Sequence, residues 1–168
     1  MKKICFFLVF IGFMFMGSAR EARAGETSLA GYLTYWDGTD TRGKGIGGTG
    51  GGIKLRKHLL GIFSADIRGG YIDFDDIDTT VIPVEATIMV GIPLLLEPYV
   101  GVGAGYYAID SDLKYDNGFG TYGLIGVQFN LFVVGAMAEV RYNTTNISLN
   151  NEDLMDGLSA NVGLMLKW

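Results

Sequence analysis

Hydrophobic and polar positions alternate along most of the chain, in stretches of about ten residues. Within these stretches, between residues 28 and 168, apolar side chains tend to take every second position, and polar residues or glycine stand between them. A period of two is typical of β-strands whose two faces meet different surroundings. A helical period is only weakly supported. We expect eight strands, at residues 28–36, 48–57, 62–74, 81–91, 97–108, 119–129, 133–142 and 158–168.

One face of the predicted strands is free of charge, and the other face carries nearly every strand charge. The charged face holds five bases and four acids, namely Lys54, Arg56, Asp66, Arg68, Glu85, Glu97, Glu139, Arg141 and Lys167. Such a near balance is expected if ion pairs fill the interior of a closed eight-stranded barrel, because an unpaired buried charge costs several kcal/mol. We expect Glu139 and Arg141 to pair with partners among Arg68, Glu85 and Glu97. A soluble β-sandwich would show the same alternation, so further observations are needed.

The connections between the strands alternate in length. Long, acidic connections are expected at residues 37–47, 74–80, 109–118 and 143–157, and short ones at residues 58–61, 92–96 and 130–132. This asymmetry is typical of a transmembrane β-barrel with both termini on the periplasmic side.

Aromatic residues on the uncharged face stand near strand ends. One predicted rim holds Tyr35, Tyr71, Tyr106, Phe119 and Tyr142, and the other holds Phe63, Phe129, Phe132 and Trp168. Two such girdles are expected around a lipid-embedded band, because amphipathic rings prefer the headgroup level. A sheet can span a membrane only if it closes and pairs all of its backbone groups. We therefore predict an all-β, eight-stranded, antiparallel, up-and-down transmembrane β-barrel.

The N-terminus has the features of a secretory signal peptide. Lys2 and Lys3 precede an uncharged run over residues 4–19, and Ala22 and Ala24 are the small residues that a signal peptidase reads. The run is short for a retained membrane helix. We expect cleavage after Ala24, which leaves residues 25–168 as the barrel domain, without the single cysteine of the chain.

Composition and charge limit the partners. The 168 residues include 26 glycines and only 3 prolines, and the formal charge is −5. Without residues 1–24, 9 bases face 17 acids. Because nucleic acids are negatively charged, we expect no nucleic-acid partner for a chain with this excess of acidic residues.

Several segments resemble a known family. They are residues 97–107 (EPYVGVGAGYY), 118–130 (GFGTYGLIGVQFN), 138–142 (AEVRY) and the C-terminal 162–168 (VGLMLKW). Together they resemble the small outer-membrane β-barrels of Gram-negative bacteria, the group of the OmpA membrane domain and OmpX-like proteins. The resemblance implies a monomer in the outer membrane, in contact with its lipids and lipopolysaccharide. It also implies that the C-terminal strand is read by the barrel assembly machinery.

Two local patterns have competing interpretations. Residues 45–50 (GIGGTG) match the glycine pattern of dinucleotide-binding loops, but no apolar strand precedes them and no helix pattern follows. We interpret them as a flexible loop that enters the second strand, and expect no cofactor. The uncharged residues 117–138 have the length of a membrane helix, but we favour a hairpin that breaks at Asn130.

The predicted long loops are rich in acidic residues. These acidic residues are Asp37, Asp40, Asp73, Asp75, Asp76, Asp78, Asp110, Asp112, Asp116, Glu152, Asp153 and Asp156. The basic residues to set against them are Arg42, Lys44 and Lys114. Divalent-cation binding by residues 73–78 is one interpretation. A solvated, repulsive surface is the other, and we favour it because the spacing is not that of an EF-hand loop. We therefore predict no metal site.

Catalysis is the main rival class. A general base near neutral pH is most easily histidine, and the only one, His58, is expected at a short periplasmic turn. A carboxylate pair of Glu85 with Glu97 or Glu139 would be an alternative, but ion-pair networks are the commoner origin of such clusters. We predict a structural or surface-interaction barrel without catalysis. The alternatives are a narrow pore or small-molecule carrier, a lipid-modifying enzyme and a soluble barrel of lipocalin type.

Overall fold

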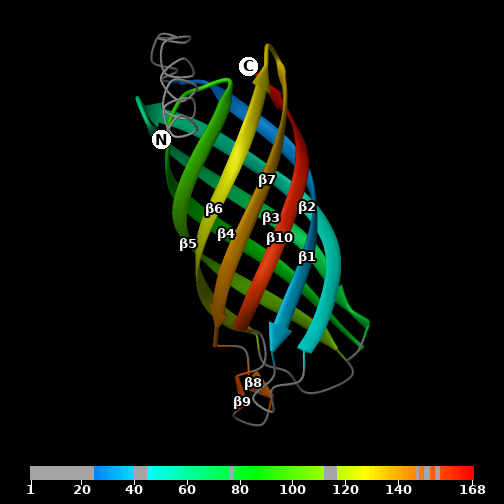
Figure 1. The fold of residues 1–168 in the computed structure, drawn as a ribbon. Helices are drawn as coiled ribbons and strands as arrows, with labels where there is room; N and C mark the ends of the chain where they lie inside the picture. The colour runs from blue at the N-terminus through cyan, green and yellow to red at the C-terminus, as the bar shows by residue number, and fades with distance from the viewer. Residues whose placement is uncertain are drawn as a thin grey trace, which may run out of the picture.

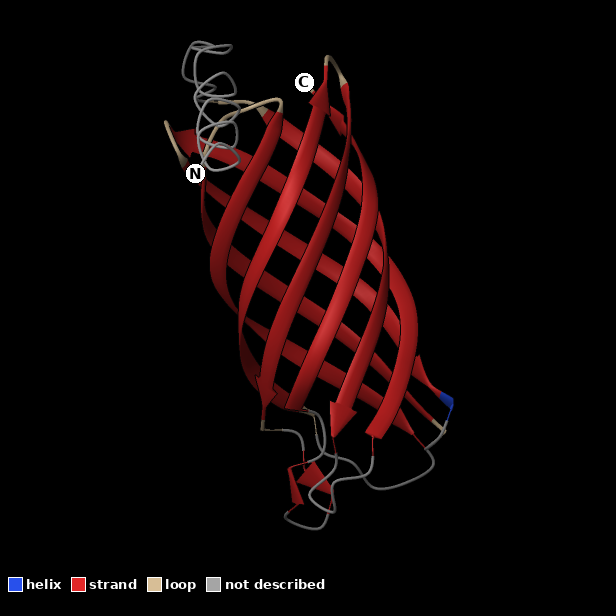
Figure 2. Cartoon of the chain, in the orientation of Figure 1, coloured by secondary structure: helices blue, strands red, loops and turns tan. Residues whose placement is uncertain are grey.

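The computed structural model describes residues 25–39, 45–75, 78–111, 117–146, 148–149, 152–153 and 156–168. Eight strands of this part of the chain close into a barrel (Figures 1 and 2). They are β1 (Thr27–Thr39), β2 (Gly45–Leu60), β3 (Phe63–Phe74), β4 (Thr79–Gly91), β5 (Leu96–Ser111), β6 (Gly118–Leu131), β7 (Val134–Thr145) and β10 (Asp156–Lys167). The short strands β8 (Ser148–Leu149) and β9 (Glu152–Asp153) pair with each other outside the barrel wall.

Each barrel strand pairs antiparallel with its neighbours along the chain, and β1 pairs with β10 to close the ring. The turns after β2, β4 and β6 lie at one end of the barrel together with the C-terminus, and we call it the short-turn end. The β8–β9 hairpin lies beyond the opposite end, which we call the long-loop end (Figure 1). The predicted fold class, an eight-stranded up-and-down β-barrel, is confirmed. Among the described residues, no helix has the length and apolar character needed to cross a membrane.

The alternation in sequence becomes an alternation between inside and outside. On β4, Val84 and Ile88 are exposed on the outer wall, whereas Glu85 and Thr87 between them are buried inside. The same pattern holds on β10, where Leu164 is 74% exposed and Met165 is 3% exposed. The outer wall is therefore apolar and the interior is polar, the inverse of a soluble barrel built around an apolar core.

Several strands extend beyond the predicted limits, and the first correction concerns residues 45–50. Residues 45–50 are not a flexible loop but the first part of β2, in register with β1 from Thr39↔Gly45 onward. Their glycines leave room for neighbours: a Cβ at Gly48 would lie 2.6 Å from the ring of Phe74, which points into the barrel. The small residues here allow close packing. Because glycines take both inward and outward positions, the sequence shows little alternation of apolar and polar residues in this part of β2.

Two short turns also lie further along the chain than expected. His58 is not in a turn: β2 continues to Leu60, and the buried His58 ring points inward, with Nδ1 2.9 Å from Ser64 Oγ. Asn130 does not break the hairpin of residues 117–138, because it lies within β6 and is only 1% exposed. The turn itself is Phe132–Val133, between β6 and β7. The hairpin interpretation holds, and the helix alternative is wrong.

Some predictions fall outside the described residues. The signal peptide, residues 1–24, is one of them, and the loop residues Asp40, Arg42, Lys44, Asp76, Asp112, Lys114 and Asp116 are others. Asp37, Asp110 and Asp156, predicted in loops, instead lie on the ends of β1, β5 and β10. Asp73 lies within β3, on its outward face, as the predicted strand 62–74 implied.

Candidate functional site: the interior charge cluster and the outer wall

Glu139 is the centre of a cluster of ion pairs inside the barrel. Its strand β7 alternates strictly, so the carboxylate points inward between Ala138 and Val140, which face outward. Oε1 accepts a hydrogen bond from Lys54 Nζ at 2.6 Å and one from the Tyr99 hydroxyl at 2.8 Å. Arg56 also donates to Oε1, at 3.3 Å, and Arg68 donates to Oε2 at 2.9 Å.

Two further carboxylates extend the cluster. Asp66 lies 3.3 Å from Arg56, 3.2 Å from Arg68 and 3.8 Å from Lys54. On the other side, Glu85 accepts hydrogen bonds from Arg141 at 2.6 Å and from the Tyr107 hydroxyl at 2.7 Å. Arg68 joins the two sides, because its Nε lies 4.0 Å from Glu85. We call these seven charged residues, Lys54, Arg56, Asp66, Arg68, Glu85, Glu139 and Arg141, the interior charge cluster.

Four cations face three carboxylates in the interior charge cluster, and all seven side chains are 6% exposed or less. Tyrosine rings meet the guanidinium groups and supply negative π-faces in place of a fourth carboxylate. The three pairs are Arg56 over Tyr99 at 4.5 Å, Arg141 over Tyr122 at 3.8 Å and Arg68 over Tyr32 at 5.9 Å from the ring centroid. Ion pairs, hydrogen bonds and ring contacts therefore act together on these charges, although the Nε atoms of Arg56, Arg68 and Arg141 make no hydrogen bond within the described part of the chain.

The other two residues predicted in the interior are buried closer to the short-turn end. Lys167 Nζ lies 3.3 Å from Glu26, which precedes β1. Glu97 accepts a hydrogen bond from Asn130 at 3.1 Å, and Asn130 in turn accepts one from Gln128 at 2.6 Å. Of the expected pairings, Glu139 meets Arg68 and Arg141 meets Glu85, whereas Glu97 accepts its hydrogen bond from the amide of Asn130.

Sequence reasoning missed the tyrosines and amides of the interior. Tyr99, Tyr107 and Tyr122 lie on the inward face of β5 and β6, and their hydroxyls contact Glu139, Glu85 and Thr87. Tyr99 and Tyr107 follow the inward-facing Glu97 on β5 at even spacings, so the sequence did indicate that these two tyrosines face inward. No signal in the sequence pairs them with particular carboxylates, because their partners stand on strands far along the chain.

An aromatic layer fills the interior near the long-loop end. The Trp36 ring packs edge-on against Phe74 and Tyr107, with centroids 6.0 and 5.9 Å apart. Buried Ile72 and Val81 complete this layer. Together with the interior charge cluster, it fills successive levels of the lumen with side chains.

The outer wall carries the aromatic residues that the sequence placed at two rims. All are exposed: Tyr35, Tyr71, Tyr106, Phe119 and Tyr142 toward the long-loop end, and Phe63, Phe129, Phe132 and Trp168 toward the short-turn end. Tyr106 and Phe119 pack edge-on at 5.2 Å. Phe132 is 80% exposed at the tip of its turn, with a left-handed φ of 50° that is costly for a bulky residue. Backbone strain of this kind is typical of positions where the side chain has a function.

The acidic residues predicted in the long loops, where the structure describes them, gather at the long-loop end. Asp37, Asp75, Asp78 and Asp110 are exposed there, and Asp73 and Asp156 are partly so. The side chains of Glu152 and Asp153 lie outside what the structure describes. In the described ranges, no three His, Cys, Asp or Glu side chains come together as metal ligands.

A closed, antiparallel, eight-stranded wall that is apolar outside and charged inside defines the fold class of transmembrane β-barrels. Comparison with solved structures agrees. The chain is similar to the crystal structure of Neisserial surface protein A, NspA, with a TM-score of 0.75 and 15% identity over 86% of this chain and 99% of that one. It is also similar to the outer membrane protein OprG from Pseudomonas aeruginosa, with a TM-score of 0.65 and 14% identity over 87% of this chain and 97% of that one.

A third similar structure is a de novo designed transmembrane β-barrel, with a TM-score of 0.51 and 17% identity over 89% of this chain and 100% of that one. Neither a protein-family model nor a curated protein sequence matches the chain. At these identities the likeness establishes the fold, that of small eight-stranded transmembrane β-barrels.

Proposed function

We propose that this protein is an outer-membrane barrel that anchors and displays its acidic loops at the cell surface, without catalysis. The observation that carries the proposal is the inversion of the wall. Large apolar side chains such as Leu33, Val102 and Leu164 are exposed all around the outside, and ionised side chains are buried inside. Exposed apolar surface of this extent needs a lipid or protein covering. A membrane covers it on every side.

The filled lumen favours an anchor over a pore or carrier. A barrel of eight strands has an interior just wide enough to be packed by side chains. Here the interior charge cluster and the layer around Trp36 occupy it, and their buried side chains cross-link opposite walls, as in the Lys54–Glu139 pair from β2 and β7. A permanent aqueous path would require these pairs to separate.

The chemistry of the interior favours a structural role over catalysis. The carboxylates Glu139 and Glu85 are held by cations and tyrosines, and Arg68 lies against both. His58 and Ser64 form a hydrogen-bonded pair, but both are buried inside the barrel near the short-turn end, away from the outer wall. The pair therefore has no direct access to lipid, and a role in packing that end accounts for it.

The partners follow from the two surfaces. The outer wall would contact outer-membrane lipids and, toward the long-loop end, lipopolysaccharide. The C-terminal strand β10, with outward Leu164, Leu166 and Trp168, would be read by the barrel assembly machinery during insertion. A lipid covering leaves the chain a monomer in this proposal.

Labelling on intact cells tests the proposed location and orientation. The single natural cysteine lies in the predicted signal peptide, so the mature chain offers a cysteine-free background. Asp110→Cys places a thiol at the exposed long-loop end, and Phe132→Cys places one at the tip of a short turn. We expect a membrane-impermeant maleimide to label the first variant and not the second, whereas both react after lysis. Labelling of Phe132→Cys alone, or protection of both in intact cells, would contradict the proposal.

A further inference from the structure

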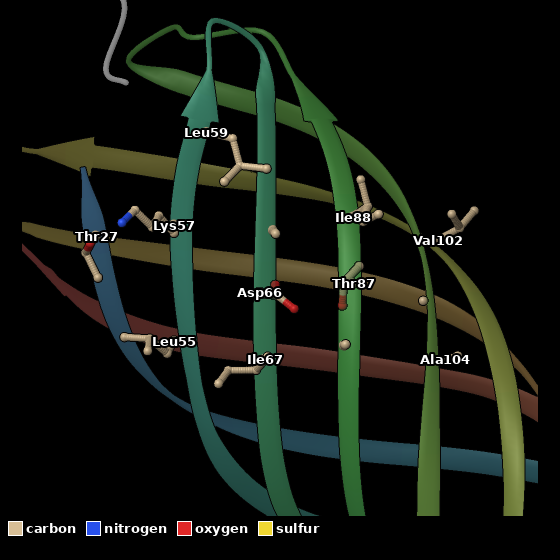
Figure 3. A pocket seen from close by; sticks show the side chains of 13 residues that line it. Thr27, Leu55, Lys57, Leu59, Asp66, Ile67, Thr87, Ile88, Val102 and Ala104 are labelled. Atoms are coloured by element: carbon tan, nitrogen blue, oxygen red, sulfur yellow. The ribbon is translucent and has the colours of Figure 1, made fainter. Parts of the chain in front are cut away.

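A shallow apolar furrow crosses the outer wall over β2, β3, β4 and β5 (Figure 3). Its volume is about 710 Å³, within the range of sites that hold small molecules. Three outward alanines, Ala65, Ala86 and Ala104, give the wall its low relief along this path. Larger side chains such as Ile67 and Ile88 stand beside them, on the same strands as Ala65 and Ala86.

The alanines descend from the short-turn end toward the middle of the wall. Ala65 lies two residues from the start of β3, Ala86 five residues from the end of β4, and Ala104 eight residues from the start of β5. Ala86 and Ala104 are direct partners in the β4–β5 register. The furrow therefore runs obliquely from the rim into the apolar band, the course of an acyl chain that enters the membrane from its surface.

Lys57 lies at the end of the furrow that is nearest the short-turn rim. It is exposed, and it lies directly opposite Ala65 in the β2–β3 register and opposite Thr27 in the β1–β2 register (Figure 3). Among the described residues of the eight barrel strands, it is the one outward-facing cation. It takes part in none of the ion pairs formed by these residues. Its long side chain lets the ammonium reach the headgroup level while its methylenes stay on the apolar wall.

Trp168 adds an indole to the same row. The backbones of Thr27 and Trp168 exchange two hydrogen bonds of 3.0 Å, so Trp168, Thr27 and Lys57 follow one another across the wall. An exposed tryptophan at a strand end is suited to the level of the headgroups. Lys57, which lines the furrow, and Trp168 thus stand on one row of the short-turn rim, with Thr27 between them.

The charge of Lys57 selects among the possible occupants of the furrow. The other charged side chains on the outward face of the described barrel strands are Asp37, Asp73, Asp110 and Asp156, all at the long-loop end. A second copy inserted in the same orientation would bring its own Lys57 rim to this level, where the carboxylate of Glu26 lies 3.3 Å from Lys167 Nζ of the same chain. A lipid phosphate supplies the negative charge that the wall of a second copy lacks.

We propose that this furrow binds one anionic glycerophospholipid from the leaflet at the short-turn end. One acyl chain lies over Ala65, Ala86 and Ala104, and the phosphate pairs with the Lys57 ammonium beside Trp168. The inference rests on the membrane location proposed above.

Fluorescence quenching by brominated lipids tests this site, because Trp168 is a natural reporter. A Trp36→Phe chain keeps Trp168 as its single tryptophan. The parent chain serves as a second background, since its Trp36 is buried inside. The mature chain is placed in phosphatidylcholine vesicles that contain a small fraction of brominated phosphatidylglycerol or brominated phosphatidylcholine. We expect the anionic lipid to give half-maximal quenching at about a fivefold lower fraction, the gain of one lysine near an anionic phosphate.

Variants separate the headgroup contact from the furrow. Lys57→Gln is expected to abolish the preference, and Ala86→Leu, which fills the furrow, to reduce it. Ala138→Leu makes the same change on the outward face of β7 and is expected to preserve it. Equal quenching by the two lipids in the parent, or a preference that survives Lys57→Gln, would overturn the inference. A chain that is not embedded would show no quenching by either lipid, which would instead contradict the proposed membrane location.

Discussion

At the scale of single residues, the carboxylate of Glu139 accepts hydrogen bonds from Lys54, Arg56, Arg68 and Tyr99 in a space closed to solvent. The four cations of the cluster are 6% exposed or less, so they lose most of their hydration. Their cost of burial is therefore offset mainly by the three carboxylates of the cluster, of which Glu139 contacts three of the four cations.

Glu139→Leu should destabilise the barrel. The substitution keeps a similar volume but leaves buried cations without their shared partner, a change that costs about 3–5 kcal/mol. Urea titration of the folded barrel in vesicles measures the free energy of unfolding. Ala138→Leu, one position away on the outward face, serves as the control and should shift the urea midpoint little. An unchanged midpoint for Glu139→Leu would show that the cluster is not what holds the interior together.

Gly126→Ala should destabilise the barrel and Gly123→Ala should not, although both lie on β6. A Cβ at Gly126 would lie 2.6 Å from the Tyr99 ring, whereas a Cβ at Gly123 meets nothing within 4 Å. Tyr99 would have to leave its place over Arg56 and its hydrogen bond to Glu139. Overpacking of this kind costs about 1–3 kcal/mol. The same urea titration compares the two variants, and equal midpoints would contradict the close packing.

At the scale of the strand, each element separates lipid-facing from interior residues by parity alone. On β10, Leu158, Val162 and Leu166 face outward, and Ser159 and Asn161 face inward. A shift of register by one residue would exchange the two sets, so the pairing of β10 with β1 and β7 is strongly specified.

An arginine on the outward face of β10 should cost more at its middle than at its end. Val162 is central in the strand and Leu158 is two residues from the end. In a bilayer we expect Val162→Arg to lower the free energy of unfolding by about 2–4 kcal/mol, and Leu158→Arg by about 1 kcal/mol or less, because the end reaches the interface. Urea titration in vesicles checks both variants. Equal costs at the two positions would mean that the wall does not lie in hydrocarbon.

The alternation of apolar and polar residues made the strands and their two faces predictable. The prediction was limited where glycine or amide residues interrupt this alternation. Val84, Ile88 and Glu85 alternate so clearly that their placement follows from the sequence. Gly48 and Asn130 have no such contrast with their neighbours, so strand residues there resembled a loop and a break.

The pairings inside the barrel were only partly predictable for a different reason. Arg68 meets Glu139 and Arg141 meets Glu85 across pairs of residues 71 and 56 positions apart in the chain. Which inward charges meet depends on the stagger of all strands around the ring. Sequence parity gives a side chain its face, but it does not fix its height in the barrel.

At the scale of the whole molecule, the barrel is a filled cylinder. Ion pairs cross the lumen between β2 and β7 and between β4 and β7, and the rings around Trp36 close the level near the long-loop end. We expect a structure of this kind to transmit no ions at rest, which would leave the two rims as its surfaces for interaction.

Planar bilayers that contain the purified barrel should therefore show no steady single-channel current. The interior side chains leave no continuous water column, so the membrane conductance should stay at that of the lipid alone. Reproducible unitary steps from the folded barrel would favour the pore alternative, in which the interior charge cluster opens.

Spin-label accessibility along β10 tests the central claim most directly, that the apolar face lies against acyl chains and the charged face looks inward. Single cysteines at outward positions 158, 160, 162, 164 and 166, and at inward position 165, where the buried Met165 side chain already occupies space, carry a nitroxide in the reconstituted barrel. We predict that lipid-soluble oxygen reaches the outward labels, most strongly at 162, and that a water-soluble nickel complex does not, while the label at 165 is protected from both. Access of the nickel complex to the label at 162 would contradict the account.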